Sequence, residues 1–146
     1  MTAPIATPLE VSLAIAEDGR ATYVDVRTVA EFVAGHPRGR TVNVPIEFHH
    51  PKTGASHANA SFVLVMTHHF ALDAPLVVGA DEGPRASAAA DALQAAGYVD
   101  VRLMSAGLPG WRAAGLPVTG YNADGVSYVS LLTPAKRTGA PATEHG

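Results

Sequence analysis

The sequence predicts an α/β fold in three layers, with a central parallel sheet flanked by helices on both faces. The first observation is that short apolar runs alternate with segments of helical spacing through residues 20–115, the pattern of a parallel sheet whose crossovers cover both faces. The second is size. A chain of 146 residues with 47% hydrophobic and 16% charged side chains can build one core but not two. A single domain is therefore expected.

Four short segments are expected to form the strands of this sheet. They lie at residues 21–26, 41–44, 76–79 and 101–104. Pro45 stops the second run, because proline cannot continue a sheet ladder. Asp25 and Arg27 lie at the end of the first run. Both are therefore expected at the carboxyl edge of the sheet, where parallel sheets bind their ligands.

Capping signals mark the helices between these strands. Thr7 followed by Pro8 predicts the start of the first helix. Thr28 and Glu31 have the spacing of a capping box, in which each side chain satisfies a backbone N–H group of the first turn. The expected helices cover residues 8–17, 28–35, 61–70, 86–96 and 107–114.

The remaining stretches carry turn or loop signals. Residues 36–40 are expected to form a turn, and the polar residues 46–59 a loop. Residues 119–146 are rich in Gly, Thr, Ala and Pro, and we interpret them as a C-terminal tail. Within this tail, residues 126–132 are apolar enough to dock on the core or on a second copy of the chain.

Composition narrows the classes of function. Lys and Arg number 10 against 13 Asp and Glu, giving a formal charge of −3 without a basic cluster, so no nucleic acid partner is expected. Residues 1–8 do not resemble a signal peptide, and no apolar stretch approaches transmembrane length, so we expect no membrane partner and a cytoplasmic location. The absence of cysteine excludes disulfides and thiolate metal sites, and no cofactor is expected.

A group of histidines raises the question of a metal site. It comprises His49, His50, His57, His68 and His69. Adjacent histidines on a helix diverge by about 100°, and no carboxylate lies at ligand spacing from them. No metal site is therefore expected.

The candidate functional site is the stretch from Leu76 to Ser87. A short strand there runs into a six-residue loop and then into an Ala-rich helix. Such a loop gathers unpaired backbone N–H groups and the positive end of the helix dipole, so it can hold an anion or an ionised nucleophile. Ala80, the residue placed to exploit this position, has no reactive group.

Three motifs, in order, resemble those of the rhodanese-like sulfurtransferases. The first is Tyr-Val-Asp-Val-Arg-Thr at residues 23–28, followed by Val-Asn-Val-Pro at 42–45, and the last is Gly-Leu-Pro-Gly-Trp at 107–111. Between them, residues 76–87 align without a gap on the strand and active loop of that family. The resemblance covers residues 5–118 and is closest to the single-domain thiosulfate sulfurtransferases of the plant type.

The active loop of this family has the pattern Cys-x-x-Gly-x-Arg-Ser. Gly83 and Arg85 match it, whereas Ala86 replaces the serine and Ala80 replaces the nucleophilic cysteine. Positions 80 and 85 are thus the catalytic positions that the resemblance implies. The anion-binding loop that it implies consists of Ala80, Asp81, Glu82, Gly83, Pro84, Arg85 and Ala86.

Family membership would imply a rhodanese-type fold and a persulfide mechanism. A thiolate at the centre of the loop takes sulfane sulfur from thiosulfate or another donor and passes it to cyanide, a thiol or another protein. The five-residue step from Ala80 to Arg85 is the loop length of sulfurtransferases, one residue shorter than in the related phosphatases and arsenate reductases. The implied partners are a small sulfur-containing anion and a thiol or protein acceptor. An alanine methyl group cannot store sulfur, so the chain is expected to be inactive.

Charged side chains around the loop bear on anion binding. Asp81 and Glu82 place two negative charges on its rim and are expected to weaken thiosulfate binding. Arg85 is expected either to bind a substrate anion or to stabilise the loop by pairing with a carboxylate such as Glu82 or Asp25.

Asp25, Arg27 and Trp111 are interpreted as structural support for the loop. An aspartate at a strand end can hold neighbouring loop amides, and Arg27 can pair with Glu31. Trp111 is expected to fix the last helix against the sheet.

Three hypotheses for the function stay open. In the first, the chain is a sulfurtransferase whose cysteine was deliberately replaced by Ala80. In the second, it is a natural pseudoenzyme that binds or regulates through the loop scaffold without turnover. In the third, it is an interaction protein that uses residues 119–146.

Overall fold

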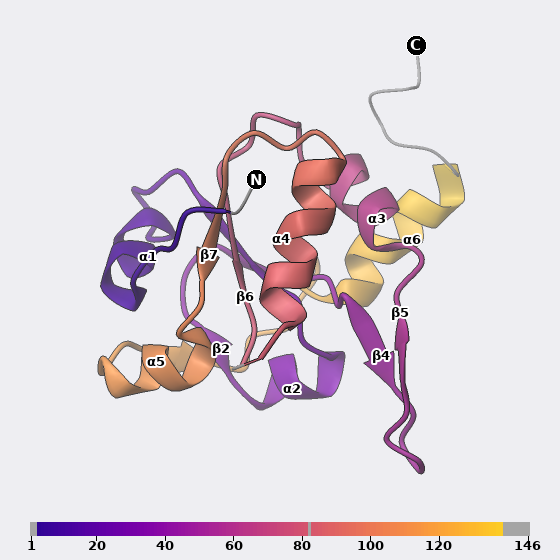
Figure 1. Cartoon of the computed structure of the whole chain (residues 1–146), viewed down its shortest axis with the longest axis horizontal. Helices are drawn as coiled ribbons and strands as arrows, with labels where there is room; N and C mark the ends of the chain where they lie inside the picture. Colours follow the sequence, from indigo (N-terminus) through magenta and orange to yellow (C-terminus); the bar gives the residue numbers. More distant parts are fainter. Residues whose placement is uncertain (1–2, 82, 139–146) are drawn as a thin grey trace.

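The computed structural model describes residues 3–81 and 83–138, which form a four-stranded parallel sheet with helices on both faces (Figure 1). The strands are β1 Thr22–Asp25, β2 His36–Pro37, β3 Thr41–Asn43, β4 Glu47–His49, β5 Ser56–Ala58, β6 Leu76–Gly79, β7 Val101–Met104 and β8 Val118–Thr119. The helices are α1 Pro8–Ala14, α2 Val29–Ala34, α3 Phe62–His69, α4 Arg85–Ala95, α5 Gly107–Ala113 and α6 Tyr128–Thr138. The predicted three-layer α/β fold is confirmed.

The central sheet has the strand order β3-β1-β6-β7, and every neighbouring pair is parallel. Val24 in β1 lies opposite Val42 in β3 and Val78 in β6. Successive side chains of a strand enter opposite cores, as Tyr23 and Val24 do. Because helices cover both faces, every residue of β1 and β6 is buried.

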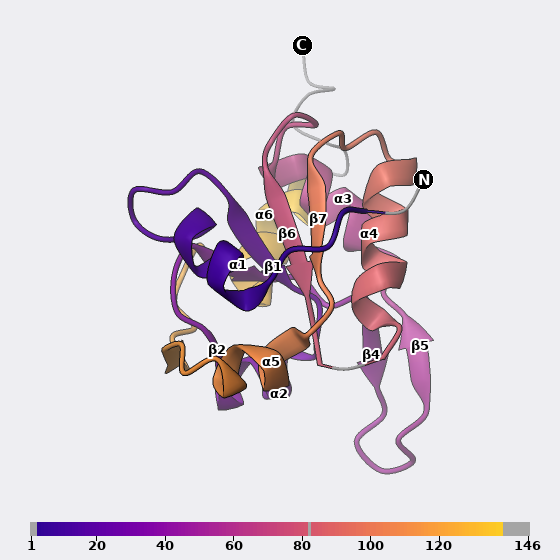
Figure 2. The ribbon, with the colours of Figure 1, turned by 60° about the vertical axis from the view of Figure 1, so that its left-hand side comes forward.

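The two faces of the sheet carry different helices (Figure 2). One core is closed by α3, α4 and α6, with Phe62 and Leu131 among its buried side chains. The other is closed by α1 and α5, which contribute Val11 and Trp111. Trp111 is fully buried and its Nε1 donates to the carbonyl oxygen of Pro117 at 2.8 Å.

The predicted N-terminal caps of α1 and α2 are present. The Thr28 hydroxyl accepts from the N–H of Glu31 at 3.3 Å, and the Glu31 carboxylate accepts from the N–H of Thr28 at 3.1 Å. Thr7 and Glu10 form a second capping box at the start of α1. Each box satisfies two N–H groups that a helix terminus leaves unpaired.

Residues 46–59, predicted as a loop, contain a small antiparallel hairpin of β4 and β5 that projects from the body of the molecule (Figures 1 and 2). Phe48 lies opposite His57, with ring centroids 5.6 Å apart. All of β5 is exposed and no residue of β4 is fully buried. The hairpin therefore has no fully buried face, although Phe48 packs partly against the core, and without such a face a strand leaves no alternating apolar pattern in the sequence.

Part of the predicted tail packs on the rest of the chain. β8 pairs antiparallel with β2, with His36 opposite Thr119, where only a turn was predicted at residues 36–40. Helix α6 packs against α3 and buries Tyr128 and Leu131 in the core. Of the two alternatives for residues 126–132, the structure shows docking on the chain's own core. The domain boundary at residue 118 stays a prediction, and the tail beyond residue 138 lies outside the described residues.

The histidines considered as metal ligands lie on two separate elements, the β4–β5 hairpin and the end of α3. Within residues 3–81 and 83–138, no three His, Asp or Glu side chains gather closely enough to hold a metal ion. No helix in the same part of the chain has the length and apolarity needed to cross a membrane.

Candidate functional site

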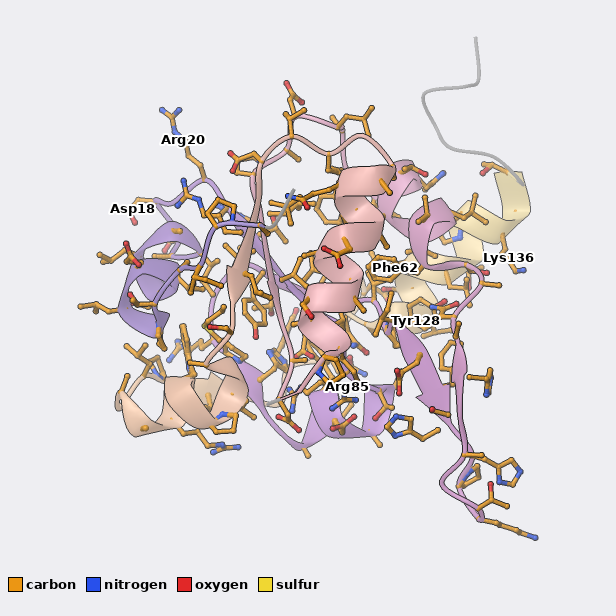
Figure 3. The ribbon with its side chains drawn as sticks, viewed as in Figure 1. Asp18, Arg20, Phe62, Arg85, Tyr128 and Lys136 are labelled. Carbon is orange, nitrogen blue, oxygen red and sulfur yellow. The ribbon has the colours of Figure 1, made fainter. Side chains whose placement is uncertain are left out.

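The loop of residues 80–84 joins β6 to α4 at the carboxyl edge of the sheet, next to the end of β1. Figure 3 places Arg85 at this edge, beside α2. Ala80 is 1% exposed and its methyl group packs in the core beneath α4. Asp81 is half-buried, and Glu82 lies outside the described residues. The position that the sequence resemblance assigns to the nucleophile is therefore occupied by a buried, unreactive methyl group.

The strand end before the loop is shaped by a close contact between Gly79 and Tyr23. A Cβ at residue 79 would collide with the Tyr23 hydroxyl, so only glycine fits there. The Tyr23 hydroxyl is buried and has no hydrogen-bond partner in the part of the chain that the structure describes. Burial raises the pKa of Tyr23 well above its usual range, and the nearby Asp25 carboxylate raises it further. Sequence analysis missed this contact, which joins residues far apart in the chain.

The first turn of α5 closes against the loop. The N–H of Leu108 donates to the carbonyl oxygen of Ala80 at 2.9 Å. Gly107 has a φ of 62°, and a Cβ there would lie 2.6 Å from the same carbonyl oxygen. Glycine is therefore required at residue 107 for two reasons, its backbone conformation and its close approach to the loop.

Helix α4 begins directly after the loop. Its N-cap residue is Pro84, whose side chain cannot accept a hydrogen bond, and among residues 3–81 and 83–138 no side chain caps the first-turn N–H groups. The Ser87 hydroxyl donates to the carbonyl oxygen of Pro84 at 3.1 Å and leaves those N–H groups free of a side-chain acceptor. An eleven-residue helix with an uncapped N-terminus presents donors and partial positive charge to an anion.

Arg85, the first residue of α4, forms a two-point ion pair with Glu31 of α2. Its two terminal nitrogens donate to the two Glu31 carboxylate oxygens at 2.7 and 2.9 Å. The hydrogen bonds from Arg85 hold the pKa of Glu31 at about 2, against the opposing effect of burial. Glu31 therefore serves two elements, because the same carboxylate also caps α2.

Asp25 and Arg27 form a second two-point pair, which is buried. Nε and one terminal nitrogen of Arg27 donate to the Asp25 carboxylate at 2.9 and 2.7 Å, and the N–H of Arg27 donates to it at 3.1 Å. Asp25 is 0% and Arg27 3% exposed. Arg27 also donates to the carbonyl oxygen of Gly35 at 2.7 Å. The Asn43 amide donates to the carbonyl oxygens of residues 25 and 27, both at 3.0 Å. These bonds fix the chain where it leaves β1.

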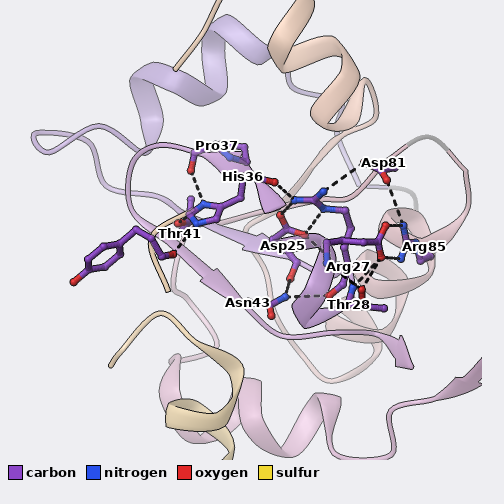
Figure 4. Close-up of polar contacts among 12 residues, drawn as sticks. Asp25, Arg27, Thr28, His36, Pro37, Thr41, Asn43, Asp81 and Arg85 are labelled. Carbon is purple, nitrogen blue, oxygen red and sulfur yellow. Dashed lines mark hydrogen bonds and ion pairs between the residues drawn. The ribbon is translucent and has the colours of Figure 1, made fainter. Parts of the chain in front are cut away.

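Asp81 lies between the two pairs (Figure 4). One carboxylate oxygen is 3.7 Å from a terminal nitrogen of Arg27 and the other is 3.7 Å from one of Arg85. Burial raises the pKa of Asp81 above its usual value. The Arg27 guanidinium opposes this rise, and the neighbouring Glu31 carboxylate adds to it. Asp81 thus places negative charge beside both arginines of the site, as a bound anion would.

The structure revises two pairings suggested by the sequence. Glu31 pairs with Arg85 and not with Arg27, whose partner is Asp25. Asp25 is therefore not available to Arg85, and the alternative partner Glu82 lies outside the described residues. The role of Arg85 towards a substrate anion stays a prediction.

Residues 7–114 match the rhodanese-like domain family. The chain belongs to this family. The match includes the strand that carries Asp25, the whole loop at residues 80–86 and the glycine-led first turn of α5, which together form the site described above. The sequence motifs that suggested the family are therefore supported by an independent comparison.

Curated relatives come from plants. The chain is 32% identical over 116 residues to the senescence-associated protein DIN1 of Raphanus sativus, covering 79% of this chain and 61% of the relative. It is 34% identical over 115 residues to the chloroplastic thiosulfate sulfurtransferase 16 of Arabidopsis thaliana, covering 75% and 92% respectively. The chain thus spans about three-fifths of the length of the first of these proteins.

Solved structures share the fold of this rhodanese-like domain. A thiosulfate sulfurtransferase from Pseudomonas aeruginosa superposes with a TM-score of 0.63 at 26% identity, over 80% of this chain and 20% of that one. The M. tuberculosis protein Rv0390 superposes with a TM-score of 0.66 at 24% identity, over 83% of this chain and all of that one. Each likeness extends over most of this chain.

Proposed function

We propose that this rhodanese-like domain does not catalyse sulfur transfer and instead retains a scaffold that binds small sulfur-containing anions without forming a covalent bond. The observation that supports the proposal is Ala80, a buried methyl group at the position of the family nucleophile in a chain without cysteine. Thiol or protein acceptors and a cytoplasmic location, both expected from the sequence, stay predictions.

The step that Ala80 prevents is the formation of a persulfide. In an enzyme with a cysteine nucleophile, the thiolate sulfur attacks the sulfane sulfur of thiosulfate. A new S–S bond forms, and sulfite leaves with the electron pair of the broken bond. Cyanide then attacks the outer sulfur, thiocyanate leaves, and the thiolate is regenerated. A methyl group has no lone pair for the first bond, so neither half of the cycle can begin.

The residues around Ala80 can still attract an anion. The uncapped N-terminus of α4 offers N–H donors and partial positive charge, and Arg85 lies at the first position of that helix. The Asp81 carboxylate opposes this attraction, since it lies 3.7 Å from Arg27 and from Arg85. Binding of thiosulfate or sulfate is therefore expected to be weak.

The chain as it stands is expected to produce no thiocyanate from thiosulfate and cyanide above the rate in buffer. The reason is the absence of any thiolate to store the sulfur. A colorimetric thiocyanate assay at several protein concentrations tests this, and intact-mass measurement after thiosulfate treatment tests for an added sulfur atom. A rate that increases with protein concentration, or a sulfur adduct, would refute the proposal.

Asp81→Asn is expected to tighten thiosulfate binding by about three- to tenfold at low salt. The substitution removes the repulsion between the Asp81 carboxylate and a bound anion, which is about 1 kcal/mol at the dielectric of a protein surface. The gain should shrink at high salt, because exposed charges are screened over about 10 Å. Calorimetry or an NMR titration measures the change.

Asp91→Asn is the matched control for this prediction, because it removes the same charge from an exposed residue of α4 that lies beyond the first turn. Equal affinities of the two variants would mean that the Asp81 carboxylate does not compete with a bound anion.

A second candidate function is that of a natural pseudoenzyme, a binding or regulatory module that retains the loop scaffold without turnover. The observation that favours it is the position of Asp81, whose charge partly neutralises the arginines that would otherwise meet a substrate anion. This candidate and deliberate replacement of a cysteine differ in what they predict when a thiol is placed at position 80.

A further inference from the structure

A cavity of about 810 Å³ lies beside the edge strand β3, apart from the loop at residues 80–86. Its walls come from the β2–β8 ribbon, from β3, from the end of α3 and from the segment that leads into α6. None of its lining residues belongs to the Ala80 loop or to the two ion pairs beside it. Its volume falls in the range of about 300–1,000 Å³ that is typical of small-molecule sites.

Much of this cavity is built by residues that follow the rhodanese-like match. Seven of its sixteen lining residues come after residue 114, where the match ends. Three hydrogen bonds hold this segment in place. The Tyr121 carbonyl oxygen lies 2.8 Å from His36 Nε2, that of Val126 accepts from the N–H of Asn43 at 3.0 Å, and that of Leu131 lies 2.7 Å from His69 Nε2.

These three bonds attach the segment to β2, β3 and α3 in turn. The wall of the cavity is thus fixed at several points, and the cavity is part of the folded structure.

The charge of the cavity is one-sided. Arg38 and Arg40 line it, and none of its lining residues is Asp or Glu. Within residues 3–81 and 83–138, no carboxylate lies within 4.0 Å of either guanidinium group. Arg40 donates to the carbonyl oxygens of Gly19 and Ala21 at 2.9 and 3.1 Å, which fixes its position but leaves its charge unbalanced. In a chain of net charge −3, this local excess of positive charge favours an anion.

The other lining groups are largely apolar. Val42, Phe70 and Leu131 contribute side chains of the main core, and Tyr121, 59% exposed, adds an aromatic ring. Thr22 and Thr41 are the buried hydroxyls among them, and that of Thr41 lies 3.4 Å from His36 Nδ1. Such a wall favours a ligand with an apolar or planar body over a small inorganic ion.

We propose that this cavity binds a small organic anion, with a ring-sized apolar body and one carboxylate, sulfonate or phosphate group directed towards Arg38 and Arg40. The apolar body packs against Val42 and Phe70, and the exposed ring of Tyr121 covers it. The site is independent of the function proposed for the Ala80 loop.

Anilinonaphthalene sulfonate, a fluorescent aromatic anion of this class, is a direct probe of the site. The folded chain is expected to bind one molecule saturably, and Arg38→Gln should weaken binding by about three- to tenfold through the loss of one charge. Arg38 is the suitable residue to change, because within the described chain its side chain makes no hydrogen bond or ion pair that the substitution would break. Arg137→Gln, which removes an exposed charge on α6 away from the cavity, should leave affinity unchanged within about twofold.

Two further measurements locate the probe and test the role of its charge. In an NMR titration of the unmodified chain, the amide shifts should concentrate on Thr119, Val126 and Leu131 and spare the loop at residues 80–86. The uncharged parent compound phenylnaphthylamine should bind more weakly than the sulfonate and should be insensitive to Arg38→Gln.

The same measurements can overturn the proposal. The proposal is wrong if Arg38→Gln and Arg137→Gln weaken binding equally, or if the uncharged parent binds as tightly as the sulfonate. It is also wrong if the amide shifts map elsewhere or if no saturable binding is found. The NMR map needs no variant, so it decides the question even if a substitution disturbs folding.

Discussion

Ala80→Cys is expected to produce a protein that takes one sulfur atom from thiosulfate and passes it to cyanide. The new thiol would lie in the loop that leads into the N-terminus of α4, where N–H donors and the helix dipole favour a thiolate. A thiol of ordinary pKa, about 8.5, is about 3% ionised at pH 7, and lowering that value by about two units gives roughly 25 times more thiolate. Because the unmodified chain is expected to show no activity, this is the largest effect we expect.

Intact-mass measurement after thiosulfate treatment tests this expectation without ambiguity, because the introduced thiol is the only one in the chain. One persulfide adds about 32 Da, and thiocyanate formation should follow. Val99→Cys is the matched control, since Val99 is 80% exposed and lies far along the chain from the loop, after the end of α4. That variant should carry no persulfide.

The outcome also separates the two readings of Ala80. Sulfur uptake by the cysteine variant would mean that the loop still forms a sulfurtransferase cradle, as expected if a cysteine was replaced. A variant that titrates like free cysteine and gains no mass would mean that the cradle has been lost, as expected for a natural pseudoenzyme. In that second case, an anion titration of the unmodified chain would test the binding proposal separately.

The parts of the fold that sequence analysis predicted well depend on local signals. The caps at Thr7 and Thr28 act within three residues, and each places a helix start correctly. The four strands of the central sheet are buried except at Arg102 in β7, so each is a short segment that the sequence displays directly. The order of motifs along the chain then identified the family.

What sequence analysis missed depends on contacts between distant residues. Arg85 and Glu31 are 54 positions apart, and nothing in either local sequence favours that pair over a pair with Asp25 or Arg27. The requirement for Gly79 arises from the hydroxyl of Tyr23 on another strand. The β2–β8 pairing likewise needs the fold to exist before its partners meet.

The region around α6 was interpreted from composition, and composition was a poor guide there. Gly, Thr, Ala and Pro suggested a tail, but Tyr128, Leu131 and Ala135 recur at helical spacing and become buried once α3 offers an apolar surface. The cavity beside β3 follows from the same docking. No local pattern could have indicated it, because its walls come from four separate parts of the chain.

Asp25→Asn is expected to destabilise the chain by about 3–5 kcal/mol, the cost of leaving one member of a buried ion pair without its partner. Asn has the shape of Asp, so the variant removes the charge and little else. Its amide would present a donor to the donors of Arg27, whose guanidinium is buried and bonds to both carboxylate oxygens. In thermal unfolding, this loss corresponds to a fall in Tm of roughly 10–20 °C for a chain of this size.

Urea unfolding measures the change directly. Asp91→Asn is the control, because Asp91 is exposed and its loss should alter stability by about 0.5 kcal/mol or less. The double variant Asp25→Asn with Arg27→Met removes both charges and should recover at least about half of the loss, since the unpaired buried guanidinium and not the missing pair is the main cost. If Asp25→Asn unfolds at the same urea concentration as the control, the carbonyl of Gly35 and the nearby Asp81 carboxylate are sufficient to hold the Arg27 charge. The pair with Asp25 would then not be what fixes the end of β1 beneath the loop.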